Sequence, residues 1–97
     1  MYEAIIDLEL DYYEDRYFRK PIHKLVHLSK QVEMPFIPSA GMYLCLMYLH
    51  FEYQIEKVSV LPNGKDLRIE MRTYHCKIEN ELNSRYTRFI EKGWNKE

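Results

Sequence analysis

The chain has 97 residues, which is the size of one small domain and too short for two independently folding cores. Its 46% hydrophobic residues and nine tyrosines exclude the composition of a disordered segment. A net charge of −1 lacks the basic excess with which most nucleic-acid-binding proteins attract phosphates, so general nucleic-acid binding is disfavoured. We therefore expect one folded domain over residues 1–97.

The two cysteines lack the close spacing of a zinc ribbon or a redox pair, so Cys45 and Cys76 are expected to be free and buried, with no metal site. The most apolar window, 42–51, is about half as long as a bilayer crossing requires. No basic region precedes an apolar stretch at the N-terminus. We expect a soluble, cytoplasmic protein without a membrane contact.

The first third of the chain alternates apolar and polar residues, as strands with one wet face do. In residues 2–12 the even positions are apolar and most odd positions are acidic, and residues 22–36 repeat the alternation. The connection between them, 13–21, is charged and ends in Pro21, which cannot donate to a β-ladder. The two runs are predicted to form a hairpin with a broad loop.

Carboxylates and histidines share the polar face of this hairpin. If its loop is centred near Tyr17, Asp11 faces His23 and Asp7 faces His27. On a strand the two histidines would lie roughly 13 Å apart, so one metal ion could not bind both. The favoured interpretation is a pair of structural cross-strand contacts, and the alternative is a catalytic or metal-binding role.

Further strands are predicted in the middle of the chain. Residues 35–41 hold two prolines and a glycine, which should redirect the chain. The segment 42–49 is apolar on both faces, as in a strand covered on both sides or a short buried helix. Alternation then resumes over 51–60, with a change of phase near Glu56-Lys57 that predicts a β-bulge.

The last third of the chain should turn once more and then change to helix. Asn63-Gly64 predicts a tight turn into a fifth strand over 67–73. From Ile78 to Ile90 the apolar residues recur every three or four positions, as on one face of a helix. Gly93 is placed as the helix stop, and Trp94 could fold back onto Phe89.

The fold class predicted from these elements is α+β. It is a curved antiparallel five-stranded sheet, or a partly open small barrel, in the order of the chain. One C-terminal amphipathic helix packs on it.

Charge is segregated along the hairpin: residues 1–15 hold six acids and no base, whereas 16–30 hold bases and no acid. Pairing of opposite charges across the hairpin explains this without a ligand. The alternative is a site for a phosphate-bearing small molecule, in which arginine supplies a planar donor fork and tyrosine a stacking face. The candidate ligand-binding residues are Tyr13, Arg16, Tyr17, Arg19, Lys20, His23 and His27. There is no glycine-rich phosphate loop or hydrolase motif, so no catalytic residue and no cofactor is assigned.

A second candidate surface lies in the apolar segment 42–49, because one helix seldom covers both faces of a sheet. The residues on one side of this segment either belong to the core or contact a partner, and we favour the partner. They are Tyr43, Cys45, Met47 and Leu49. Formation of a homo-oligomer would hide such a surface most simply.

The sequence Met-Pro-Phe-Ile-Pro-Ser-Ala-Gly at 34–41, followed by Leu44, Leu46 and the segment 55–58, resembles a pattern in small uncharacterised bacterial and phage proteins. In those proteins a Pro-Phe-x-Pro-x-x-Gly turn leads a strand into a curved β-meander. The resemblance implies a strongly curved sheet and a phage or mobile-element origin, and it assigns no residue a role.

The function expected from the sequence is that of a non-catalytic binding module acting through protein–protein interaction. The resemblance adds the hypothesis that it inhibits a component of host defence. The alternative, from another class, is a small nucleotide- or oligonucleotide-binding protein that sequesters or cleaves its ligand with the Tyr/Arg/Lys/His hairpin.

Overall fold

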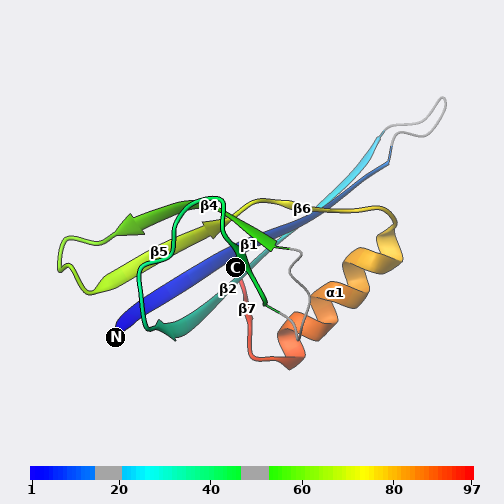
Figure 1. The fold of residues 1–97 in the computed structure, drawn as a ribbon. Coiled ribbons are helices and arrows are strands. Elements are labelled where there is room, and N and C mark those ends of the chain that lie inside the picture. Colours follow the sequence, from blue (N-terminus) through cyan, green and yellow to red (C-terminus); the bar gives the residue numbers. More distant parts are fainter. Residues whose placement is uncertain (15–20, 47–52) are drawn as a thin grey trace.

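An open, twisted sheet carries a helix on one face, and the ends of two long strands project beyond the rest of the sheet (Figure 1). The structure is a computed structural model that describes residues 1–14, 21–46 and 53–97. The α+β class and the C-terminal helix are confirmed, and this helix, α1, spans Glu79–Glu91. None of the helices in these ranges is long and apolar enough to cross a bilayer.

The sheet is mixed, and within the described residues it contains seven strands in place of the five antiparallel strands predicted. Their order across the sheet is β3-β4-β5-β1-β2-β7, with β6 also beside β1, so the sheet does not follow the order of the chain and is not closed into a barrel. The strands are β1 (Tyr2–Glu14), β2 (Ile22–Met34), β3 (Tyr43–Leu44), β4 (Tyr53–Val60), β5 (Asp66–Met71), β6 (Tyr74–Cys76) and β7 (Asn95–Lys96).

β1 is the central strand and is paired along both edges. On one side it pairs antiparallel with β2 over its whole length. On the other side it pairs parallel, first with β5 through Glu3–Asp7 and then with β6 through Leu10–Tyr12. The prediction of a purely antiparallel sheet was wrong because alternation of apolar residues reveals the buried face of a strand but not the direction of its neighbour.

The register predicted for the first hairpin was also wrong, by two residues. Tyr13 lies opposite His23 and Glu9 lies opposite His27, where Asp11 and Asp7 were expected. A shift of two residues leaves every side chain on its original face, so the alternating pattern cannot distinguish the two registers.

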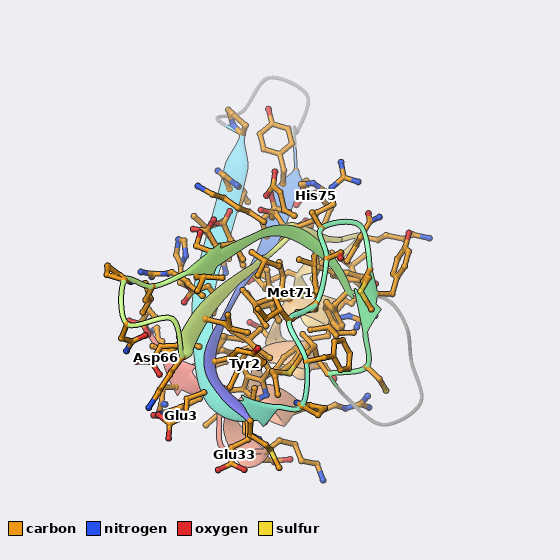
Figure 2. All side chains as sticks on the ribbon, turned by 60° about the vertical axis from the view of Figure 1, so that its left-hand side comes forward. Tyr2, Glu3, Glu33, Asp66, Met71 and His75 are labelled. Atoms are coloured by element: carbon orange, nitrogen blue, oxygen red, sulfur yellow. The ribbon has the colours of Figure 1, made fainter. Side chains whose placement is uncertain are left out.

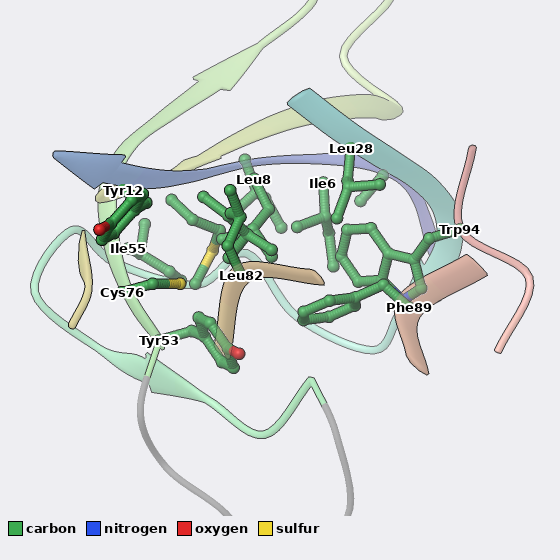
Figure 3. Close-up of a cluster of buried hydrophobic side chains, with 14 of the residues drawn as sticks. Ile6, Leu8, Tyr12, Leu28, Tyr53, Ile55, Cys76, Leu82, Phe89 and Trp94 are labelled. Carbon is green, nitrogen blue, oxygen red and sulfur yellow. The ribbon is translucent and has the colours of Figure 1, made fainter. Parts of the chain in front are cut away.

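The core lies between α1 and one face of the sheet (Figure 3). The even positions of β1 that were predicted to face inward, from Ala4 to Tyr12, are all buried. The helix adds Leu82 and Phe89, which are 2% and 0% exposed.

The helix ends as the sequence predicts. Gly93 has φ +90°, and the Trp94 N–H donates to the Phe89 carbonyl at 3.0 Å. This turn brings the Trp94 ring to 5.0 Å from the Phe89 ring, between ring centroids, in an edge-to-face arrangement.

In the middle of the chain the structure partly agrees with the sequence. The register of β4 shifts between Ile55 and Lys57, which confirms the bulge, and Gly64 has φ +72° in the predicted turn. The predicted strand over 42–49 is reduced to the two residues of β3 within the described part. The predicted fifth strand ends at Met71, after which the chain resumes as β6.

A polar cluster joins the helix to the sheet beside the apolar core. The Arg85 guanidinium donates to the hydroxyls of Tyr53 and Tyr74, each at 2.8 Å, and its Nε donates to Glu81 at 3.1 Å. The Lys77 backbone N–H donates to the other Glu81 oxygen at 3.0 Å. This backbone hydrogen bond, aided by Arg85, holds the pKa of Glu81 below its usual value.

Phe89→Ala should lower the free energy of unfolding by about 3–5 kcal/mol, because it removes a fully buried ring and leaves a cavity beneath Trp94. Chemical denaturation measures this effect. The control is Ile90→Ala, which truncates a side chain that is 39% exposed and should have a much smaller effect. Equal losses in the two variants would contradict the docking of α1 through Phe89.

Glu81→Gln should lower stability at pH 7 by about 1 kcal/mol, because it removes a charged hydrogen-bond acceptor. The folded-state pKa of Glu81 lies below its usual value, so its contribution is present above that usual value and is lost as pH falls through the folded-state pKa. The stability difference between wild type and variant should therefore shrink in acid. A difference that stays constant down to about pH 2 would contradict the cluster. The control, exposed Glu91→Gln, should follow wild type throughout.

Candidate binding surface

The face of the sheet opposite the helix, called here the outer face, is polar along its centre. It carries the odd positions of β1, including Asp7, Glu9 and Asp11. Figure 2 shows His75 toward the projecting end of the sheet and Glu3 and Glu33 at the opposite end.

Each of these three β1 carboxylates is engaged by side chains from neighbouring strands. Asp7 accepts from Arg68 Nε at 2.7 Å, and this hydrogen bond raises the pKa of Arg68. Glu9 accepts from the Thr73 hydroxyl at 3.1 Å and lies 3.4 Å from His27 Nε2. The acidic row is therefore paired with basic and hydroxyl groups of β2, β5 and the β5–β6 connection.

Asp11 is shared between two imidazoles. Its Oδ1 lies 2.5 Å from His75 Nδ1 and its Oδ2 lies 3.5 Å from His23 Nε2. The Asp11 side chain is 14% exposed, whereas those of His23 and His75 are 54% and 77% exposed. The carboxylate thus holds two solvent-facing histidines at the base of the projecting hairpin.

The middle of the outer face is hollowed, with a volume of about 470 Å³. Five carboxylates line this hollow together with Arg68, His27 and Thr73, and they belong to Asp7, Glu9, Glu56, Glu70 and Glu97. Nowhere in residues 1–14, 21–46 and 53–97 do three His, Cys, Asp or Glu side chains gather in a way that could hold a metal ion. The hollow is a negatively charged surface whose charges are partly neutralised by their neighbours.

The predicted ligand-binding residues separate into three groups. Tyr13 and His23 lie together near the projecting end, with their rings edge-to-face at 6.0 Å between centroids. His27 lies further along β2, beside Glu9. Arg16, Tyr17, Arg19 and Lys20 lie outside the described residues.

The free edge of β2 was not anticipated from the sequence. β7 pairs with β2 only at Leu28 and Ser29, and the Glu97 N–H donates to the His27 carbonyl at 3.0 Å. Outward-pointing backbone groups recur at every second residue of a paired strand, so those of His23 and Leu25 also point away from β1. Among the described residues no strand pairs with this edge over Ile22–Val26.

Of the predicted interface residues, Tyr43 lies in β3 and Cys45 directly follows this strand. Tyr43 is 53% exposed and Cys45 is exposed, while Leu44 between them packs against the core. Met47 and Leu49 lie outside the described residues. The expectation that both cysteines are buried is wrong for Cys45, because its segment runs along the rim of the core.

Cys76 differs from Cys45 in its surroundings. It is buried at the end of β6, and burial, with Glu81 nearby, raises its pKa to about 11. A thiol that stays protonated at neutral pH is a poor nucleophile, so a catalytic thiol at Cys76 is disfavoured.

The contacts of His75 and Arg72 were missed by sequence reasoning. His75 meets Asp11 because β6 lies parallel to β1, and Arg72 meets Gln54 because it continues the antiparallel pairing of β5 with β4 beyond Met71. The sequence feature that could have indicated these contacts is the run Arg-Thr-Tyr-His at 72–75, which follows an apolar strand.

No protein-family model, curated protein or solved structure was found to match this chain. Its function therefore has to be inferred from its own surfaces.

The native protein should react with a thiol reagent through Cys45 and not through Cys76, because only Cys45 is exposed. Titration with a chromogenic disulfide should give one thiol per chain before unfolding and two in denaturant. Cys45→Ser should abolish the native reaction. Two thiols reacting at equal rates in the native protein would contradict the burial of Cys76.

Proposed function

We propose that this protein is a non-catalytic binding module that recognises an extended segment of a partner protein along the edge of β2. The carrying observation is the outer edge of β2 over Ile22–Val26, the edge away from β1, with which no strand of residues 1–14, 21–46 and 53–97 pairs. The β1–β2 hairpin projects past the rest of the sheet at this end (Figure 1). Exposed strand edges present backbone donors and acceptors that an incoming strand can pair with.

The side chains around this edge suit a segment with alternating apolar residues. On the outer face Leu25 and Tyr13 are 45% and 58% exposed, which is high for large apolar side chains. On the helix side Ile22 and Val26 are half-buried against the core. An added strand would cover apolar surface on both faces while its backbone pairs with His23 and Leu25.

Lys24 favours a partner other than a second copy at this edge. An antiparallel second copy that used all the free groups of His23 and Leu25 would place the two Lys24 side chains opposite each other, which is unfavourable for like charges. A partner strand without a basic residue at that position avoids this repulsion and leaves Lys24 paired with Glu79 at the start of α1. Self-association through the exposed surface around Tyr43 and Cys45 stays a separate prediction, as does the phage-inhibitor hypothesis.

Leu25→Pro tests the proposal with little disturbance of the fold. The Leu25 N–H points away from β1, so proline removes a donor that only a partner could use. Extended peptides would be selected from a displayed random library against wild type, and their affinities measured for both proteins. We expect Leu25→Pro to weaken them by about fivefold or more, through the lost hydrogen bond and the added ring.

Leu25→Ala is the matched control, because it trims the side chain and keeps the N–H. It should weaken binding less than Leu25→Pro, and thermal melts should show both variants folded. Peptides that bind Leu25→Pro as tightly as wild type would overturn the proposal. Sedimentation of wild type reports separately on self-association.

A further inference from the structure

A second hollow, of about 320 Å³, lies where β3, β4 and the β5–β6 connection meet. It is separate from the β2 edge and is lined by Tyr43, Gln54, Arg72, Thr73, Tyr74 and His75. Tyr43 pairs with Gln54 across β3 and β4, and the Arg72 N–H donates to the Gln54 carbonyl at 2.8 Å. An aromatic ring, an amide and a guanidinium therefore form a row across three adjacent segments.

The Arg72 side chain is held in place but is not neutralised. Its Nη1 donates to Gln54 Oε1 at 3.0 Å, and Gln54 is held in turn because its Nε2 donates to the Gly41 carbonyl at 3.0 Å. Arg68 and Arg85 each bind a carboxylate, whereas Arg72 has no carboxylate partner among the described residues. An exposed, oriented guanidinium with unused N–H groups is suited to bind an oxyanion.

His75 supplies a second polar group to the same hollow. Its Nδ1 is engaged by Asp11 at 2.5 Å, so Nε2 is the ring nitrogen left for a ligand, and Nε2 donates to an anion when the ring carries both protons. The carboxylates that contact lining residues are Asp11, engaged by His75, and Glu9, which accepts from the Thr73 hydroxyl. Neither lines the hollow itself, so an anion entering it would meet the Arg72 guanidinium and the doubly protonated His75 ring as donors.

The ring of Tyr43 borders these polar groups. Tyr43 is 53% exposed and presents its ring to solvent. Tyr74 also lines the hollow, but its side chain is directed to the helix side, where its hydroxyl accepts from Arg85 at 2.8 Å and donates to Glu81 at 3.3 Å. An exposed aromatic ring close to an arginine is the combination that binds a flat base joined to a phosphate.

We propose that this hollow binds a nucleoside monophosphate, with the phosphate on Arg72 and His75 and the base stacked on Tyr43. Its volume lies at the lower end of the range for small-molecule sites, which suits a mononucleotide. A phosphate monoester presents three terminal oxygens and close to two negative charges to the guanidinium and the doubly protonated imidazole, whereas a carboxylate presents two oxygens and one charge, which favours phosphate. The site uses none of the backbone groups of the β2 edge.

The test is a titration of the whole chain with adenosine 5′-monophosphate, adenosine, inorganic phosphate and benzoate, followed by backbone amide NMR. The monophosphate should saturate the shifts of Arg72, Thr73 and His75, and bind at least about tenfold more tightly than each other probe. Arg72→Gln should weaken its binding by about tenfold or more. Tyr43→Ala should lower the affinity for the monophosphate by about tenfold and leave the affinity for inorganic phosphate unchanged.

Arg88→Gln is the matched control, because it removes the same charge from the exposed side of α1 and should leave the affinity unchanged. Amide spectra of each variant without ligand report whether the fold is kept. The proposal is overturned if the monophosphate does not saturate at millimolar concentrations, or if Arg72→Gln binds it like wild type. It is also overturned if adenosine or benzoate binds as tightly as the monophosphate.

Discussion

The pairing of β1 along both of its edges is the constraint on which the rest of the structure depends. β2 follows it antiparallel for its full length, while β5 and then β6 follow it in parallel on the other side. Its even residues from Ala4 to Tyr12 belong to the core together with Leu82 and Phe89 of the helix. Its odd residues lie on the outer face and include the row of carboxylates Asp7, Glu9 and Asp11. A strand in this position fixes which polar side chains from distant parts of the chain become neighbours.

Both proposed surfaces follow from that arrangement. The pairing of β6 with β1 brings His75 to Asp11, and the pairing of β5 with β4, which Arg72 extends by one residue, brings Arg72 to Gln54. On the opposite edge, β7 is too short to cover β2, so the backbone groups of His23 and Leu25 are left without a strand partner in the described part of the chain. Asp7, Glu9 and Asp11 of the outer face are engaged by Arg68, Thr73 and the histidines. These carboxylates therefore stabilise the contacts between strands.

The parts of the fold that depend on local patterns could be predicted from the sequence. Alternation identified the buried face of β1, and the three-and-four spacing identified α1 together with its stop at Gly93 and the return of Trp94. The phase change at Glu56-Lys57 identified the bulge in β4.

The parts that depend on distant pairing could not be predicted. The parallel partners of β1 are more than 60 residues away along the chain, as the pairing of Ala4 with Leu67 shows. The alternation of apolar and polar residues in these strands does not reveal whether they run parallel or antiparallel to β1. A two-residue change of hairpin register moved Glu9 opposite His27 without altering any face. For this reason the sequence placed Asp7 beside His27 where the structure has Glu9, whereas the predicted contact of Asp11 with His23 is present at 3.5 Å as a diagonal pair.

Residue-by-residue amide hydrogen exchange along β2 tests the central claim, which is that this edge is open. The account predicts fast exchange at His23 and Leu25, whose N–H groups face outward, and slow exchange at Lys24 and Val26, whose N–H groups bond to β1. Protection at all four amides would mean that the edge is already covered. The reverse alternation would mean that β2 pairs with β1 in a different register.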